Sequence, residues 1–100
     1  MSEQTFKIKV HPGEILKEEF LAPLEISAGV LAKNLDVPRT RIERLVKEQT
    51  AITPDTALRL AKFFGSTPQF WVNLQNTYDL VEASETADLE HIKPFELMSA

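Results

Sequence analysis

The pattern of hydrophobic and polar positions is mostly that of helices separated by proline and glycine. Pro12 suits the first turn of a helix, where its missing N–H is not needed, and Pro23 is expected to end that helix. Between them, apolar residues recur at intervals of four and five, as on one side of a helix. They are Ile15, Leu16, Phe20 and Leu21.

The next two helices are separated by a turn of only a few residues. Ser27 is a suitable N-cap, and the residues after it predict a helix over 28–35. A third helix is expected from Pro38 to about Lys47. This spacing is the signature of a helix-turn-helix, whose second helix enters the major groove of DNA. The apolar face expected for 28–35 consists of Val30, Leu31 and Leu35.

Two further helices each begin with a threonine followed by a proline. Thr53 and Thr67 are expected N-caps, and Gly65 is expected to end the fourth helix because glycine adopts left-handed backbone at little cost. The fifth helix begins at Pro68 and continues toward Leu89. The chain therefore predicts an all-α fold.

The one strand-like pattern lies in residues 5–10, where apolar residues alternate with lysines. A single strand has no sheet to join, so an extended arm is predicted, and pairing with another chain is the alternative. The predicted organisation is an arm at 1–10, a helix-turn-helix domain at 11–80 and an acidic extension at 81–100.

The predicted third helix has two different sides. Ile42, Leu45 and Val46 fall within about 100° of one another on a helix and form its apolar stripe. The opposite side is mostly cationic, which is typical either of DNA recognition or of a solvated basic face. Glu43 is expected to brace Arg39 and Lys47, four residues away on either side.

Arginine and threonine are suited to reading base edges. The forked guanidinium of Arg39 or Arg44 can donate two hydrogen bonds to guanine, and Thr40 can use its hydroxyl on a base or its methyl group against thymine. Ser27 and Thr53 stand at helix starts, where backbone N–H groups commonly meet phosphate.

The charge balance changes when it is divided along the chain. The 100 residues carry 15 acidic and 11 basic side chains, a net charge of -4, which by itself argues against DNA as a partner. Residues 31–62, however, carry seven cations and four carboxylates, whereas residues 77–100 carry six carboxylates and one lysine. The DNA partner is therefore expected at the basic middle of the chain.

Several functions are excluded at this stage. The chain has no cysteine, no Gly-rich phosphate loop and no Ser-His-Asp pattern, and its two histidines are far apart. No enzyme activity, metal site or cofactor is expected, and His11 is expected to be a helix-entry residue. With no apolar run long enough for a membrane span, the protein is expected to be cytoplasmic, and nucleoid-associated when bound to an operator.

Three blocks of sequence resemble one family of regulators. They are HPGEILKEEFLAPLEIS at 11–27, LAKNLDVPRTRIERLV at 31–46 and AITPDTALRLAKFFGSTPQFWVNLQNTYDL at 51–80. The chain resembles the HigA-type antitoxins, which are xenobiotic-response-element-like helix-turn-helix proteins once labelled virulence-associated protein I. The third block is the most specific, because the helix-turn-helix alone indicates only a very large superfamily.

The resemblance implies a five-helix lambda-repressor-like DNA-binding domain. It also implies an antitoxin that binds the double-stranded operator of its own operon and neutralises a RelE-like, ribosome-dependent mRNA endonuclease. In this family the base readers correspond to Arg39, Thr40 and Arg44, and flanking backbone contacts correspond to Arg41 and Lys47. Ala28 and Pro38 depart from the common Gln and Ser or Thr, so the operator sequence does not follow from the resemblance.

A homodimer is expected, because palindromic operators require a two-fold protein. The predicted fifth helix carries an apolar stripe that either packs in the core or forms a seam between two copies. Its members are Phe70, Trp71, Leu74, Tyr78 and Val81.

The toxin-facing surface is expected on the arm and the first helix, because RelE-like toxins are basic as a family. The acidic segment from Asp79 to Glu90 is the alternative. Two other functions stay open: a stand-alone transcriptional regulator, and an interaction module that has lost DNA binding. The acidic residues expected to face the toxin are Glu14, Glu18, Glu19 and Glu25.

Overall fold

The computed structural model of the chain describes residues 9–96, and within them every regular element is helical. Three consecutive segments form one continuous first helix, so the five-helix all-α prediction is confirmed. Most of the predicted arm lies outside the described residues. The elements are α2 (Pro12–Ile15), η1 (Leu16–Leu21), α3 (Ala22–Leu24), α4 (Ala28–Leu35), α5 (Arg39–Val46), α6 (Pro54–Phe64) and α7 (Pro68–Thr86).

Side chains at the helix starts satisfy backbone donors that have no partner within the helix. The Oγ of Ser27 accepts from the N–H of Val30 at 3.1 Å, and the threonine caps of α6 and α7 act in the same way at 3.2 Å. His11 begins the first helix, since its Nδ1 accepts from the N–H of Gly13 at 2.9 Å. The predicted helix-entry role of His11 and the predicted caps are confirmed.

The first helix does not end at Pro23 as predicted. It continues to Leu24 and ends at Glu25, which has left-handed backbone with φ 56°. The preceding segment η1 is a π-helix, in which the N–H of Ala22 donates to the carbonyl of Lys17, five residues back. A proline removes a donor and crowds the preceding turn, and the wider π turn accommodates it within the helix.

The core lies where the first helix, α4, α5, α6 and α7 meet. Trp71 is fully buried at its centre, and its indole N–H donates to the Oγ of Ser66 at 2.9 Å. The ring of Phe20 lies 4.8 Å from both the Phe64 and Trp71 rings, so the first helix is joined to α6 and α7. The buried apolar residues are Leu16, Leu21, Leu31, Ala32, Leu35, Ile42, Leu45, Ile52, Ala57, Leu60, Ala61, Trp71 and Val81.

Two predicted apolar faces need correction. Val30 is 47% exposed, so the buried face of α4 is Leu31, Ala32 and Leu35. Phe70 is also exposed. The side chain of Gln75, which was not in the predicted stripe, is buried on α7. Of the other residues in the predicted α7 stripe, Trp71 and Val81 are core residues and Leu74 and Tyr78 are half-buried.

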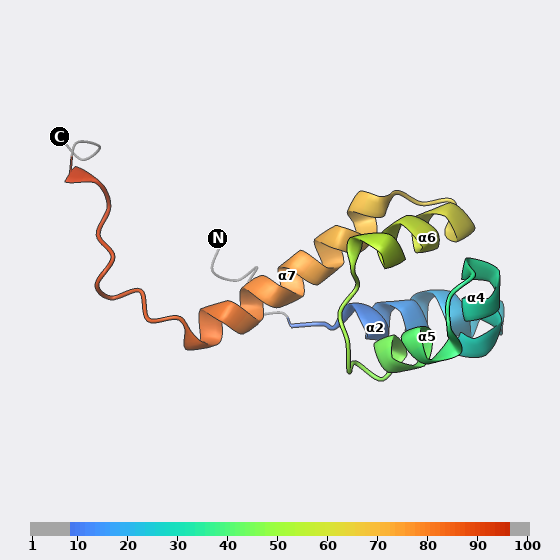
Figure 1. The fold of residues 1–100 in the computed structure, drawn as a ribbon. Coiled ribbons are helices and arrows are strands. Elements are labelled where there is room, and N and C mark those ends of the chain that lie inside the picture. Colours follow the sequence, from blue (N-terminus) through green and yellow to red (C-terminus); the bar gives the residue numbers. More distant parts are fainter. Residues whose placement is uncertain (1–8, 97–100) are drawn as a thin grey trace.

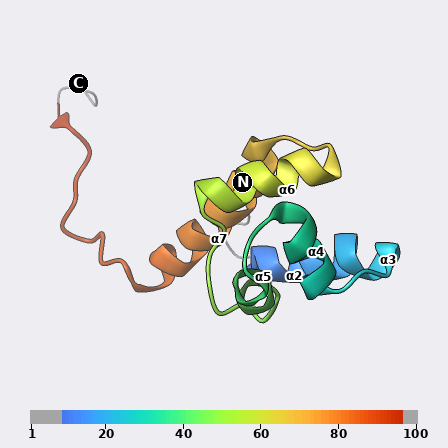
Figure 2. The ribbon, with the colours of Figure 1, turned by 45° about the vertical axis from the view of Figure 1, so that its right-hand side comes forward.

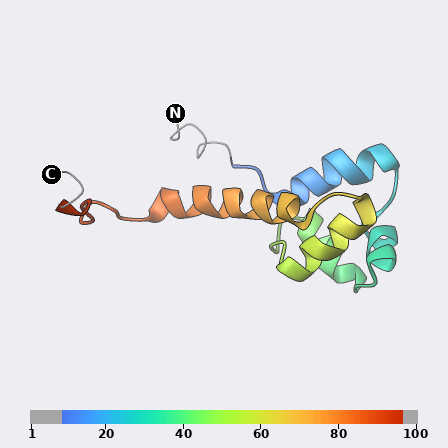
Figure 3. The ribbon, with the colours of Figure 1, turned by 90° about the horizontal axis from the view of Figure 1, so that it is seen from above.

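Helix α7 extends well beyond the body formed by the other helices, which makes the molecule 57 Å long and about 21–23 Å across (Figures 1 and 3). Lys9, which precedes the first helix, forms ion pairs with this protruding part of α7. Its ammonium lies 3.0 Å from the carboxylates of Glu82 and Glu85. These hydrogen bonds raise the pKa of Lys9 above its usual range. Residues 87–96 leave the end of α7 and lie away from the body.

Candidate nucleic-acid interface

Helices α4 and α5 form the predicted helix-turn-helix, packed side by side at one end of the molecule (Figure 2). Asp36 ends α4 with left-handed backbone at φ 60°, and its N–H donates to carbonyls of the last turn. Arg59 of α6 donates from Nη1 to the carbonyl oxygen of Leu35 at 2.8 Å. The turn is therefore held by its own backbone and by a side chain from a distant helix.

Helix α5 has the two sides that its sequence predicts. Ile42 and Leu45 are buried and Val46 is half-buried, so the apolar stripe is confirmed. The opposite side is exposed to solvent. The Nε of Arg39 lies 2.9 Å from the carboxylate of Glu43, and the Arg39 side chain remains 73% exposed. Glu43 thus braces Arg39 as expected and leaves most of the guanidinium accessible, whereas no ion pair joins Glu43 to Lys47 in the described part of the chain.

Four of the residues predicted to contact DNA line one hollow of about 490 Å³. The hollow lies between the exposed side of α5, the loop after it and the start of α6. Thr50 and Ala51 of that loop also line it, as do Pro38, Asp55 and Thr56. A groove-facing helix with an adjacent polar loop is the arrangement that contacts both base edges and phosphates. The four predicted residues are Thr40, Arg41, Arg44 and Thr53.

Two more of the predicted residues lie near Gly29, at the start of α4. A Cβ added to Gly29 would lie 2.9 Å from the Cδ of Arg39 and 3.8 Å from the Oγ of Ser27. Gly29 therefore leaves room for the aliphatic part of Arg39 beside the Ser27 cap. Lys47 is exposed just after the end of α5, outside both groups.

Asp55 lies between two arginines at the edge of this hollow. Its Oδ2 is 2.6 Å from the Nη1 of Arg41 and 3.0 Å from the Nε of Arg59. Hydrogen bonds from Arg41, and then from Arg59, lower the pKa of Asp55 below its usual 3.8. Part of the basic charge in the middle of the chain is thus neutralised within the protein.

This ion pair has a defined pH dependence. Because the folded state lowers the pKa of Asp55, the pair stabilises the fold above the pKa of the unfolded chain, and its contribution is lost as the pH falls through the lower folded-state value. We expect Arg41→Ala to raise the pKa of Asp55 toward 3.8, as measured by an NMR titration of its carboxyl carbon. Lys17→Ala, on the exposed surface of the first helix, is the control. An unchanged Asp55 pKa in Arg41→Ala would contradict the pairing.

Gln75 positions the loop that completes the hollow, although its role could not be predicted from the helical pattern. Its buried Oε1 accepts from the N–H of Ile52 at 2.7 Å, and its Nε2 donates to the carboxylate of Asp79 at 2.9 Å. The amide thus joins α7 to the residue directly before the Thr53 cap.

Gln75→Leu should leave the buried N–H of Ile52 without a partner. We expect a loss of about 1–3 kcal/mol in the free energy of unfolding, measured by urea titration. Asn76→Leu also replaces a side-chain amide by leucine, but at the exposed neighbouring position. It should change this free energy by less than about 0.5 kcal/mol. Equal stability of the two variants would show that the Gln75 hydrogen bond does not hold the loop.

The residues proposed to face a toxin occupy a different surface. Glu14, Glu18, Glu19 and Glu25 are all exposed on the first helix or at its end. Among residues 9–96, no group of histidine, aspartate and glutamate side chains has the geometry to hold a metal ion. No helix in the same range is long and apolar enough to cross a membrane.

Comparison with known proteins places these features in context. A family model described as helix-turn-helix matches residues 16–71, which includes α4 and α5. Virulence-associated protein I of Dichelobacter nodosus is 53% identical over 76 residues, covering 76% of this chain and 70% of that protein.

Two solved structures are similar over most of the chain. An addiction module antidote protein of a HigA family from Coxiella burnetii superposes with a TM-score of 0.83 and 44% identity, over 88% of this chain and 100% of that one. Pseudomonas aeruginosa antitoxin HigA, solved with the higBA promoter, gives a TM-score of 0.80 and 37% identity, over 88% and 99%.

Proposed function

The chain belongs to the helix-turn-helix family, as a DNA-binding regulator of the HigA antitoxin type, and we propose that it represses its own operon and neutralises a RelE-like mRNA endonuclease. Proteins of this family are non-enzymatic DNA-binding proteins. The observation that carries the DNA part is the exposed cationic side of α5 beside the hollow lined by Thr40, Arg41, Arg44 and Thr53.

In this proposal the exposed side of α5 reads bases. Arg39 and Arg44 each donate two hydrogen bonds to the O6 and N7 of a guanine, and Thr40 contacts a base through its hydroxyl or methyl group. Arg39 starts from a braced geometry, because Glu43 holds one edge of its guanidinium. Bracing lowers the side-chain entropy that is lost when a base is bound.

The surrounding residues position the protein on the phosphates. Ser27 accepts a hydrogen bond from its own helix, so its hydroxyl proton stays available to a phosphate oxygen. The hydroxyl of Thr53 also donates to the Oγ1 of Thr56 at 3.2 Å, so it must turn away from Thr56 to donate to a phosphate. Arg41 and Lys47 contribute positive charge on either side of the base readers. Because Arg41 is already paired with Asp55, Lys47 is the stronger phosphate contact of the two.

The toxin contact is proposed on the first helix rather than on the acidic segment from Asp79 to Glu90. In that segment Glu82 and Glu85 are already paired with Lys9 of the same chain. The glutamates of the first helix, in contrast, form an exposed acidic surface, which complements a basic partner. The two surfaces would let one chain hold DNA through α5 and a toxin through the first helix.

The test uses the gene neighbouring the one for this protein. A reporter driven by the chain's own upstream region should be repressed by the wild-type protein. Cells expressing the neighbouring reading frame should stop growing unless the protein is also made. Glu18→Lys with Glu19→Lys should abolish the growth rescue and retain repression, whereas Asp88→Lys with Glu90→Lys should retain both.

Each failure has a separate meaning. If the neighbouring reading frame is harmless, the toxin proposal is overturned and a stand-alone regulator remains. If the reporter is not repressed, autorepression is overturned, whatever the outcome of the growth assay. Rescue that survives the Glu18 and Glu19 changes and is lost on changing Asp88 and Glu90 would place the toxin on the C-terminal segment instead.

A further inference from the structure

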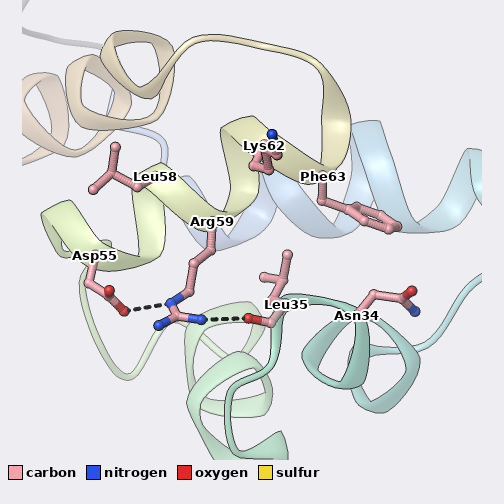
Figure 4. A pocket seen from close by; sticks show the side chains of 7 residues that line it. All are labelled: Asn34, Leu35, Asp55, Leu58, Arg59, Lys62 and Phe63. Carbon is pink, nitrogen blue, oxygen red and sulfur yellow. Dashed lines mark hydrogen bonds and ion pairs between the residues drawn. The ribbon is translucent and has the colours of Figure 1, made fainter.

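A groove lies between the end of α4 and the middle of α6, on the far side of Asp55 from the DNA-facing hollow. Its volume is about 620 Å³, within the range of sites that bind ligands. Leu58 and Phe63 are 59% and 40% exposed at its rim and lie on either side of Lys62 (Figure 4). Arg59 crosses its floor to reach the carbonyl of Leu35. The groove is therefore partly apolar, and its positive charge comes from Lys62, because Arg59 is paired with Asp55, which also lines the groove.

The described C-terminal segment, residues 87–96, has complementary properties. Leu89, Ile92 and Phe95 are 62%, 71% and 67% exposed, which leaves three large apolar side chains without cover. In the structure a turn joins the first two, since the N–H of Ile92 donates to the carbonyl of Leu89 at 3.0 Å. Once this turn opens, their spacing of three residues places them on one edge of a polyproline II helix, which has three residues per turn. Pro94 favours this conformation and opposes an α-helix. The segment also carries three carboxylates and one lysine.

Most of the tail cannot reach the groove of its own chain. Leu58 and Lys62 line one hollow together with Pro68, the first residue of α7. Helix α7 then carries the chain about 28 Å away, at about 1.5 Å per residue. From Thr86, an extended chain takes Leu89 at most about 11 Å, Ile92 about 21 Å and Phe95 about 32 Å. Only Phe95 spans that distance, so the three apolar side chains cannot all dock in the groove of their own chain.

We propose that the tail of a second copy, with Leu89, Ile92 and Phe95 in an extended conformation, docks in the groove lined by Leu58, Lys62 and Phe63. The acidic tail meets Lys62, and its apolar edge covers Leu58 and Phe63. Two such contacts, related by a two-fold axis, would join two copies and leave the exposed side of α5 free. This pairing rests on the proposed operator binding, for which a homodimer is expected from the sequence, but its test uses no DNA.

The absence of cysteine from the chain makes a direct test possible. One full-length chain, of natural isotopic abundance, carries a spin label at Lys93→Cys. It is mixed with a second chain that is enriched in nitrogen-15 and carries no spin label. We expect the amide signals of residues around Leu58, Lys62 and Phe63 to lose intensity, and those of the exposed side of α5 to keep theirs. Unchanged intensities, or losses confined to α7, would overturn the proposal.

Variants at exposed positions test the contact without disturbing the core. Ile92→Asp in the spin-labelled chain, or Leu58→Asp in the isotope-labelled chain, should abolish the loss of intensity and weaken dimer formation about tenfold or more, as measured by sedimentation. Leu24→Asp is the matched control, since Leu24 is 55% exposed outside the groove. If Leu24→Asp has the same effect as Leu58→Asp, the groove is not the docking site.

A dilution experiment distinguishes docking of the tail within one chain from docking between two chains. When a chain carrying both labels is diluted tenfold with unlabelled protein, exchange between copies should restore most of the lost intensity. Persistence of the full effect would mean that the tail folds back on its own body, which overturns the proposal. Operator affinity measured separately on the same wild-type protein shows whether the DNA-binding function holds in either case.

Discussion

Replacing Arg39 and Arg44 together by alanine should lower the affinity for the operator by between about thirtyfold and ten-thousandfold, and should remove most of the preference for the operator over shuffled DNA. A bidentate arginine–guanine contact discriminates against a wrong base by about 1–3 kcal/mol, and two such contacts are lost. Both side chains are exposed on α5, so the fold should be unaffected. The measurement is a gel shift with both DNAs.

Two controls separate base reading from charge. Lys47→Ala removes a proposed phosphate contact and should weaken binding to all sequences alike. It should also lower the slope of log affinity against log salt concentration by about one. Lys17→Ala removes a charge from the first helix and should change neither quantity. If the double arginine variant weakens operator and shuffled DNA by the same factor, Arg39 and Arg44 are phosphate contacts and not base readers.

Gly13→Ala should destabilise the protein more than any exposed substitution, by about 3 kcal/mol. A Cβ at this position would lie only 1.8 Å from the backbone carbonyl oxygen of Leu45. The first helix and the end of α5 would have to separate, since neither backbone can yield by rotating a side chain. For a chain of this size, such a loss lowers the melting temperature by on the order of 15 °C.

Gly29→Ala is the matched comparison. There the added Cβ meets only the Cδ and Cγ of Arg39, which belong to a flexible side chain that can move. Because alanine favours a helix over glycine by about 0.5–1 kcal/mol, we expect nearly unchanged stability and an altered position of Arg39. Calorimetry compares the melting temperatures of Gly13→Ala and Gly29→Ala. Equal melting temperatures would contradict the close approach of the first helix to α5.

The helix boundaries were predictable because their determinants are local. Ser27, Thr53 and Thr67 each cap a donor only three residues ahead, and Gly65 ends α6 within one turn. The two sides of α5 follow from helical periodicity alone. Pro23 shows the limit of such rules, because a π turn allows the helix to continue past it.

The supports of the site were not predictable, because their partners are distant in the sequence. Gln75 holds the N–H of Ile52, 23 residues away, and Arg59 holds the carbonyl of Leu35, 24 residues away. Nothing in the local pattern around Gly13 indicates that the backbone of Leu45 passes against it. These residues reveal their roles only after the helices have been packed.

The charge count along the sequence overestimated the positive charge that is free to meet a partner. Residues 31–62 are a basic segment, as counted from the sequence. Within it, however, Arg41 and Arg59 share the carboxylate of Asp55, and Arg59 faces the turn after α4 and not the solvent side of α5. The cations left for DNA are therefore concentrated on α5 and just after it.

The central claim is that the exposed side of α5 recognises the DNA upstream of the protein's own gene. The most direct test is a fluorescence anisotropy titration of the full-length protein on that DNA and on a shuffled sequence of the same composition, at two salt concentrations. We expect the upstream DNA to bind at least about a thousandfold more tightly, and both complexes to weaken as salt rises. Equal affinity for the two sequences at both salt concentrations would contradict the claim.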